Sequence, residues 1–186
     1  TELIYSLQQT NDGGYILGGN SYSDDGDVGG NNGSQDFWIV KTDAMGNLQW
    51  EQNFGGSSYD ALKSIQQTND GGYILGGDTD IDDGVEENID FWIIKTDALG
   101  NLQWEQNFGG LGPETLQALQ QTNDGGYILG GSTYSNDGDV GSNNGTYDFW
   151  IVKTDASGNL QWEQNFGGFD PETLHALQQT NDNGYI

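Results

Sequence analysis

The sequence predicts an all-β protein made of four-stranded antiparallel blades that repeat every 54–58 residues in a β-propeller-like array. Three observations lead to this fold class. Two sequence blocks recur at nearly constant spacing, each copy holds four short strand-like segments separated by turn residues, and one segment of each copy is apolar on both faces. Helical periodicity is absent from the 186 residues, which argues against a helical repeat protein.

The repeat is defined by two blocks of sequence. The segment QQTNDGGYILGG occurs three times and a truncated QQTNDNGYI once, beginning at Gln8, Gln66, Gln120 and Gln178. The block DFWI-(V/I)-KTDAxGNLQWEQNFGG occurs three times, beginning at Asp36, Asp90 and Asp148. These spacings predict blades at residues 1–56, 57–110 and 111–168 and the start of a fourth repeat at residues 169–186. Because the chain begins at Thr1 with no visible signal peptide and ends near the same phase of the repeat, we expect it to be a processed product or a window from a longer protein.

The second copy illustrates the four predicted strands, at residues 62–68, 73–79, 90–96 and 102–108. The first two strands are joined by the turn sequence NDGG, in which glycine readily adopts a positive φ. In the last repeat this turn reads NDNG, and asparagine is the residue that best replaces glycine in the left-handed region. We therefore expect a positive φ at Asn183. The turn between the last two strands has Asp first and Gly fourth, which favours a type I turn with a bulge.

The third strand of each copy indicates how the blades are arranged. In the second copy, Phe91 and Ile93 point to one face while Trp92 and Ile94 point to the other, so both faces are apolar. A strand of this kind must be covered on both sides, which blades stacked face to face provide. Propellers usually close with four to eight blades, so three cannot complete a standard ring. Further copies, association of chains or an open array remain as alternatives, and open blade edges would allow self-association.

The charge balance argues against several classes of partner. Lys and Arg number 4 against 29 Asp and Glu, a formal net charge of -25, so nucleic acids would be repelled. No apolar run approaches the roughly 20 residues that a membrane-spanning helix needs, so we expect no membrane insertion. The chain has no cysteine, so disulfides and thiolate metal sites are impossible.

The run SNDGDVGSNNGTYDFWIVKTDASGNLQWEQNFGG at residues 135–168, with the QQTNDNGYI that follows, resembles β-propeller repeats of bacterial secreted and cell-surface proteins. In those repeats a D-(F/Y)-W strand, a GN turn, a W-x-x-x-(F/L)-GG strand and a QT-x-DGGY hairpin recur. The resemblance covers essentially the whole chain, except that residues 81–88 replace the DGDVGSNNG loop with a shorter acidic one. It implies an extracellular or bacterial cell-surface location, often reached by type IX secretion, and it defines no catalytic residue.

The loop between the second and third strands holds the candidate metal ligands. Asp25, Asp27 and Asn31 recur as Asp137, Asp139 and Asn143. Hard oxygen ligands at this density suit calcium, although the spacing is not that of an EF-hand and the second copy lacks the counterpart of Asp27. The alternative is a solvated loop, because Asp and Asn commonly hydrogen-bond their own backbone in loops.

Three of the four lysines occupy the same position of the third strand, at Lys41, Lys95 and Lys153. We expect each to form a salt bridge across the hairpin of the third and fourth strands, Lys41 with Asp43 or Glu51. An anion-binding site is the alternative. The single histidine, His175, is replaced by Tyr, Lys or Gln in the other copies, so we expect a surface residue without a catalytic role.

Repetition without a unique set of reactive side chains predicts a non-enzymatic structural or adhesive repeat region of an extracellular bacterial surface protein, acting as a rigid scaffold. One alternative is a glycan- or ligand-binding module with calcium-ordered loops, because Trp38, Trp50 and their repeats could stack on sugars if exposed. The alternation of the aromatic residues instead favours burial between blades. The other alternative is a subunit of an extracellular fibre or assembly. Glycans and other surface proteins are the expected partners.

Overall fold

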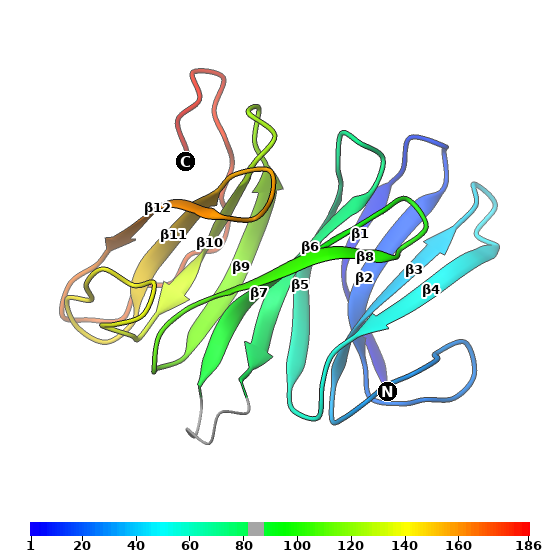
Figure 1. The fold of residues 1–186 in the computed structure, drawn as a ribbon, viewed down its shortest axis with the longest axis horizontal. Coiled ribbons are helices and arrows are strands. Elements are labelled where there is room, and N and C mark those ends of the chain that lie inside the picture. The colour runs from blue at the N-terminus through cyan, green and yellow to red at the C-terminus, as the bar shows by residue number, and fades with distance from the viewer. Residues whose placement is uncertain (82–87) are drawn as a thin grey trace.

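The structure, a computed structural model, describes residues 1–81 and 88–186. The described residues contain twelve strands in three four-stranded sheets, which lie side by side (Figure 1). Within each sheet the strands follow one another in chain order and every neighbouring pair is antiparallel. The all-β, blade-like fold expected from the repeats is confirmed.

The three sheets are called blades 1, 2 and 3. Blade 1 contains β1 (Glu2–Gln9), β2 (Tyr15–Ser21), β3 (Asp36–Thr42) and β4 (Leu48–Phe54). Blade 2 contains β5 (Asp60–Gln67), β6 (Tyr73–Asp80), β7 (Ile89–Thr96) and β8 (Leu102–Phe108). Blade 3 contains β9 (Glu114–Gln121), β10 (Tyr127–Thr133), β11 (Asp148–Thr154) and β12 (Leu160–Phe166). Blade 2 lies between the other two, and no sheet of the described residues closes a ring (Figure 1).

The hairpin turns have the predicted backbone geometry. Gly71, in the turn between β5 and β6, has a φ of 85°, and Asn183 at the matching position of the last repeat has a φ of 67°. The expected positive φ at Asn183 is therefore confirmed. Gly100 ends the turn between β7 and β8 with a φ of 81°, and the strand register shifts next to this turn, between Lys95 and Thr96. This irregularity is the predicted bulge.

The third strand of blade 2 is covered on both faces, as predicted. In β7, Phe91 and Ile93 are fully buried on one face, and Trp92 and Ile94 are buried on the other. Blades 1 and 3 each have a single neighbour among the three sheets, so their third strands bury one face more completely than the other. In β3 the face that carries Phe37 is buried, and in β11 the face that carries Trp150 is buried. The faces differ because the two strands pack against opposite sides of blade 2.

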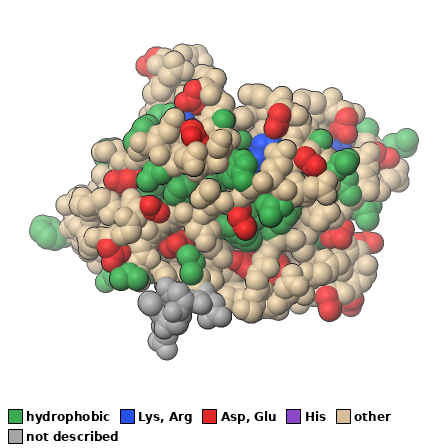
Figure 2. Space-filling view, in the orientation of Figure 1, with side chains coloured by type: hydrophobic (Ala, Val, Ile, Leu, Met, Phe, Trp, Pro, Cys, Tyr) green, Lys and Arg blue, Asp and Glu red, His purple; other side chains and the backbone are tan. Residues whose placement is uncertain are grey.

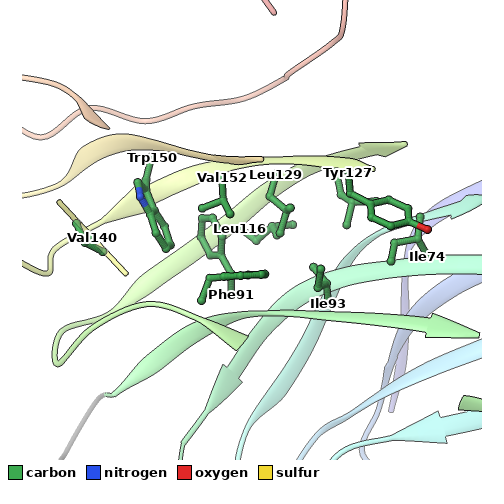
Figure 3. Packing of buried hydrophobic residues seen from close by; sticks show 11 residues of the cluster. Ile74, Phe91, Ile93, Leu116, Tyr127, Leu129, Val140, Trp150 and Val152 are labelled. Atoms are coloured by element: carbon green, nitrogen blue, oxygen red, sulfur yellow. The ribbon is translucent and has the colours of Figure 1, made fainter. Parts of the chain in front are cut away.

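Two hydrophobic clusters join the blades through corresponding residues. The cluster between blades 1 and 2 contains Phe37, Ile39, Leu62, Ile65, Tyr73, Leu75, Trp92 and Ile94, together with Ile16. The cluster between blades 2 and 3 contains their counterparts Phe91, Ile93, Leu116, Leu119, Tyr127, Leu129, Trp150 and Val152, together with Ile74 (Figure 3). Burial of this apolar surface stabilises the stack at about 25 cal/mol per Å².

The first strands of successive blades are joined by a ladder of side-chain hydrogen bonds. The side-chain oxygen of Gln8 accepts a hydrogen bond of 2.7 Å from the backbone nitrogen of Gln67. Gln66 and Gln120 make the same bond, also 2.7 Å long, to Gln121 and Gln179. Residues 169–186 thus continue the array, and Tyr185 packs on Trp162 of blade 3. The described part of the chain contains no helix that could cross a membrane.

Candidate functional site

The lysines of the third strands form three equivalent clamps, in each of which a buried lysine binds a partly exposed aspartate. The ammonium group of Lys41 lies 2.9 Å from the Asp12 carboxylate and also donates to the Thr42 carbonyl at 2.8 Å and the Gln49 side chain at 3.0 Å. Lys95 and Lys153 repeat these contacts with Asp70 and Asp124. Each clamp ties the turn between the first two strands of a blade to the hairpin of the last two.

The expected partners of these lysines were therefore wrong. Asp43 does not bind Lys41 because its carboxylate already accepts hydrogen bonds from the backbone nitrogens of Met45 and Asn47 within its own turn. Glu51 accepts a hydrogen bond of 3.1 Å from the Trp38 indole instead. The lysine side chains are 3–4% exposed, not surface groups.

The clamps are saturated as hydrogen-bonding groups. An ammonium group has three N–H donors, and each clamp lysine meets a carboxylate, a backbone carbonyl and a glutamine oxygen. Hydrogen bonds from Thr122 and from Lys153 lower the pKa of Asp124 to about 2, so this carboxylate stays ionised over a wide pH range. The arrangement favours a structural role for the lysines over the anion site considered as an alternative.

The loop residues expected to bind calcium lie at one end of the blades, between the second and third strands. Asp25 and Asp27 are exposed. Asn31 is half-buried and closes its loop: its amide nitrogen donates to the Ser21 carbonyl at 2.8 Å, and its side-chain oxygen accepts from the Gly33 nitrogen at 3.0 Å. Asp and Asn often make such hydrogen bonds to the backbone of their own loop, so these contacts fit the alternative of a solvated loop without a metal.

In blade 3 the corresponding loop is tied to the connection from blade 2. Asp137 accepts a hydrogen bond of 2.9 Å from the Leu111 nitrogen, and the backbone nitrogen of Asp139 donates to the Gly109 carbonyl at 2.9 Å. Asn143 donates to the Thr133 carbonyl at 3.0 Å, as Asn31 does to Ser21. Among described residues, no three acidic or histidine side chains form a metal-binding group. Calcium at these loops stays a prediction, and residues 82–87 of the second loop lie outside the described ranges.

A pair of carboxylates at the junction between blades was not expected from the sequence. Asp36 begins β3 of blade 1, and Asp60 begins β5 of blade 2, where its backbone nitrogen donates to the Gln35 carbonyl at 2.8 Å. Both side chains are buried, Asp36 at 0% exposure and Asp60 at 3%. The next junctions place Asp90 beside Glu114 and Asp148 beside Glu172.

The two carboxylates of a junction converge beside a glycine. A Cβ atom at Gly55 would lie 2.4 Å from Oδ1 of Asp36 and 2.8 Å from Oδ2 of Asp60. At Gly167 the corresponding distances are 2.3 Å to Asp148 and 2.4 Å to Glu172. A side chain at either glycine would occupy the space between the carboxylates, so the sequence GG at the end of each copy keeps this space open.

Burial changes the acid–base properties of these groups. Burial raises the pKa of Asp36 and of Asp60, with the charge of Asp36 adding to the effect at Asp60. The sequence did carry a signal for the junction, because an acidic residue begins both the third strand of a copy and the first strand of the next, 24 residues later. The contact was missed because it forms between copies and not within one.

A second side-chain contact crosses the boundaries between the blades, from β2 and from β6. Asn20 accepts a hydrogen bond of 2.7 Å from the Leu62 nitrogen of blade 2, and Asp78 accepts the same bond, also 2.7 Å, from the Leu116 nitrogen of blade 3. Asp78 lies 3.5 Å from Lys63. Burial raises the pKa of Asp78 to about 6 even though Lys63 opposes the shift.

The aromatic residues proposed as sugar platforms are divided between core and surface. Trp92 and Trp150 are buried at 9% and 0% exposure, so neither presents a face to a ligand. Trp162 is 38% exposed on blade 3. Near the second-to-third-strand loops, Tyr22 and Tyr134 are 47% and 49% exposed. On the face shown in Figure 2, hydrophobic side chains gather across the middle and acidic side chains are scattered around them.

No family model and no curated protein matches this sequence. Among solved structures, the chain is similar to a protein of unknown function from Bacteroides caccae, with a TM-score of 0.57 and 8% sequence identity. The similarity covers 99% of this chain and 52% of that chain, so this chain spans about half the length of its structural neighbour. At this identity the likeness shows the fold alone: an array of four-stranded antiparallel blades in a propeller-like arrangement.

Proposed function

We propose that the chain is a non-enzymatic structural or adhesive repeat region of an extracellular bacterial surface protein, and that its blades form a rigid scaffold for the loops. The observation that carries the proposal is the repetition of the contacts between blades. The Phe37–Trp92 and Phe91–Trp150 pairs both have ring centroids 4.8 Å apart, and the glutamine ladder has the same 2.7 Å bond at every junction.

Identical junctions suit a scaffold because each added copy extends the array without changing its geometry. The buried lysine clamps support the same role, since each of them stiffens one blade at the end where its two hairpins turn. Strong acidity, a formal net charge of -25, keeps such a surface from binding anionic polymers non-specifically.

Two measurements test the proposal. Antibodies against the chain should label intact cells of the producing bacterium, as a surface location requires. The purified chain, assayed against chromogenic esters, glycosides, phosphoesters and peptides, should show no turnover that depends on a particular residue. Turnover that a single substitution abolishes would overturn the non-enzymatic assignment, and labelling confined to permeabilised cells would overturn the location.

Glycan binding is the second candidate, and the half-exposed tyrosines Tyr22 and Tyr134 favour it. Both lie directly after the second strand of their blades, next to the loops considered for calcium. Exposed aromatic rings of this kind can stack on sugars. A glycan array probed with the chain and with Tyr22→Ala/Tyr134→Ala tests this function: binding lost in the variant supports it, and silence of the wild-type chain on the array rejects it.

A further inference from the structure

Among the described residues, no lysine forms an ion pair with the junction carboxylates Asp36, Asp60, Asp148 or Glu172. The chain has four lysines and no arginine. Lys41, Lys95 and Lys153 bind the turn carboxylates Asp12, Asp70 and Asp124, and Lys63 binds Asp78. The buried pair of Asp36 and Asp60 therefore has no lysine partner, although burying carboxylates without a compensating charge is costly.

One oxygen of the junction is also without a hydrogen-bond donor. Oδ2 of Asp36 accepts a hydrogen bond of 2.8 Å from the Asn32 nitrogen, but Oδ1 is buried and has no partner. Oδ1 of Asp36 and Oδ2 of Asp60 are the two carboxylate oxygens that approach the Cβ position at Gly55, at 2.4 and 2.8 Å. Asp148 repeats this arrangement: Oδ2 accepts from the Asn144 nitrogen at 2.8 Å, while Oδ1 is buried without a partner beside Glu172.

The partner carboxylates are oriented by the glycine loop. Oδ2 of Asp60 accepts a hydrogen bond of 2.8 Å from the Gly56 nitrogen, and its Oδ1 accepts one from the Thr79 hydroxyl. Glu172 accepts from the Gly168 nitrogen at 3.2 Å. Each of these oxygens keeps a free lone pair, since a carboxylate oxygen can accept more than one interaction. The junction is thus a preformed pair of carboxylates held by backbone donors.

We propose that the carboxylate pair at a blade junction binds a divalent cation, with calcium as the ion that fits best, and that the ion links the third strand of one blade to the first strand of the next. The bound oxygens are Oδ1 of Asp36 with Oδ2 of Asp60, and Oδ1 of Asp148 with Oε2 of Glu172. Calcium accepts carboxylate, carbonyl and water ligands in flexible geometry, so water completes a site with two protein carboxylates.

The first junction can be reached from solvent on the side of Asp60, although both of its carboxylates are buried. Asp60, Gly55 and Thr79 line a cavity of about 840 Å³ between blades 1 and 2. A site with two carboxylates and several waters belongs to the weak class, with a dissociation constant of about 10⁻⁴–10⁻³ M, as in extracellular calcium modules. Because burial raises the pKa of Asp36 and Asp60, the competing way to neutralise the pair is a proton shared between the two carboxylates.

Calorimetric titration of the chain with CaCl₂ at pH 7.5, together with thermal unfolding in CaCl₂ and in EGTA, tests the proposal. We expect weak saturable binding and a higher unfolding midpoint with calcium. The Asp36→Asn/Asp60→Asn variant should lose the heat of one junction and part of the stabilisation. Asp25→Asn/Asp27→Asn is the matched control, since it removes two acidic groups from the exposed loop of the same blade and should retain both effects.

The outcomes separate the proposal from its alternatives. Absence of calcium-dependent heat, with stability that instead rises as the pH is lowered, would overturn it in favour of a shared proton. Loss of binding in the loop variant but not in the junction variant would also overturn it, and would assign calcium to the loops. If Asp36→Asn/Asp60→Asn does not fold, Asp148→Asn/Glu172→Gln tests the junction at the other end of the array by the same loss of heat.

Discussion

The ring of Phe37 in blade 1 packs against the ring of Trp92 in blade 2 with centroids 4.8 Å apart and an interplanar angle of 50°. Phe91 and Trp150 repeat the contact at 4.8 Å and 43° between blades 2 and 3. The alternating Phe and Trp of one strand thus point to opposite neighbours, so a single β7 strand takes part in both junctions. This arrangement explains why the third strand needs large apolar side chains on both faces.

Replacement of Trp92 by alanine should strongly destabilise the array. The ring is 9% exposed and contacts Phe37, so its loss leaves a cavity at the first junction. Large-to-small substitutions of this kind cost about 3–5 kcal/mol. Urea denaturation followed by circular dichroism measures the change. Trp162→Ala is the control, because Trp162 lies on the fourth strand of blade 3 and is 38% exposed. It should cost less, and equal losses would contradict the packing described.

Removal of the clamp lysine should reduce stability in acid. In the folded chain the pKa of Asp124 is about 2 against an ordinary 3.8. A lowered carboxyl pKa contributes stability that is present above pH 4 and is lost as the pH falls toward 2. Lys153→Met should therefore reduce stability at neutral pH and weaken the acid dependence between pH 4 and 2. Thr122 keeps part of the shift, so NMR titration should show the Asp124 pKa rising only partway; an unchanged pKa would contradict the clamp.

The pH dependence should have the opposite sign at Asp78. Its pKa is raised to about 6, so the folded chain binds this proton more tightly than the unfolded chain. The corresponding stability is fully present below the ordinary pKa of 3.8 and is lost as the pH rises through 6. Asp78→Asn keeps an oxygen for the Leu116 nitrogen, as Asn20 does for Leu62, and removes this dependence.

The free energy of unfolding of Asp78→Asn, relative to that of the wild-type chain, should therefore increase by roughly 1–3 kcal/mol as the pH rises from 4 to 8. Chemical denaturation at several pH values measures the difference. Asp80→Asn, which changes a nearby residue on the same strand, serves as the control. Its stability should depend on pH in the same way as that of the wild-type chain. A constant difference between Asp78→Asn and wild type across the range would contradict the buried, protonatable carboxyl.

The turn glycines should tolerate asparagine better than alanine. Gly71 has a φ of 85°, a region that alanine adopts at a cost of about 1–2 kcal/mol. Asn183 occupies the equivalent position of the last repeat with a φ of 67°. Thermal unfolding of Gly71→Ala and Gly71→Asn compares the two directly. A more stable alanine variant would show that the turn does not require a positive φ.

The sequence predicts the elements of this fold well because local chemistry determines them. The NDGG turns, the alternation around Phe91 and Trp92, and the substitution at Asn183 each have one physical reading, and the structure confirms all of them. The partner of Lys41 was wrong because Asp43 and Glu51 are already used by the Met45 nitrogen and the Trp38 indole. Side-chain competition of this kind cannot be read from spacing.

Contacts between copies were harder to predict than contacts within one. The pairing of Asp36 with Asp60 depends on how one blade packs against the next. The repeat pattern alone shows only that an acidic residue begins each of these strands. The same holds for the ladder from Gln8 to Gln67, whose glutamines are part of the recurring QQT motif but contact different copies. Repetition predicts that the blades stack, but which atoms meet depends on how one blade packs against the next.

Nuclear Overhauser contacts between selectively labelled aromatic rings test the face-to-face stacking of the blades most directly. We expect cross-peaks from Phe37 to Trp92 and from Phe91 to Trp150 in the folded chain, because the ring centroids of both pairs lie 4.8 Å apart. We also expect the Trp92 and Trp150 rings to be shielded from a soluble paramagnetic agent. Missing cross-peaks together with strong paramagnetic broadening of either tryptophan would contradict the stacked arrangement.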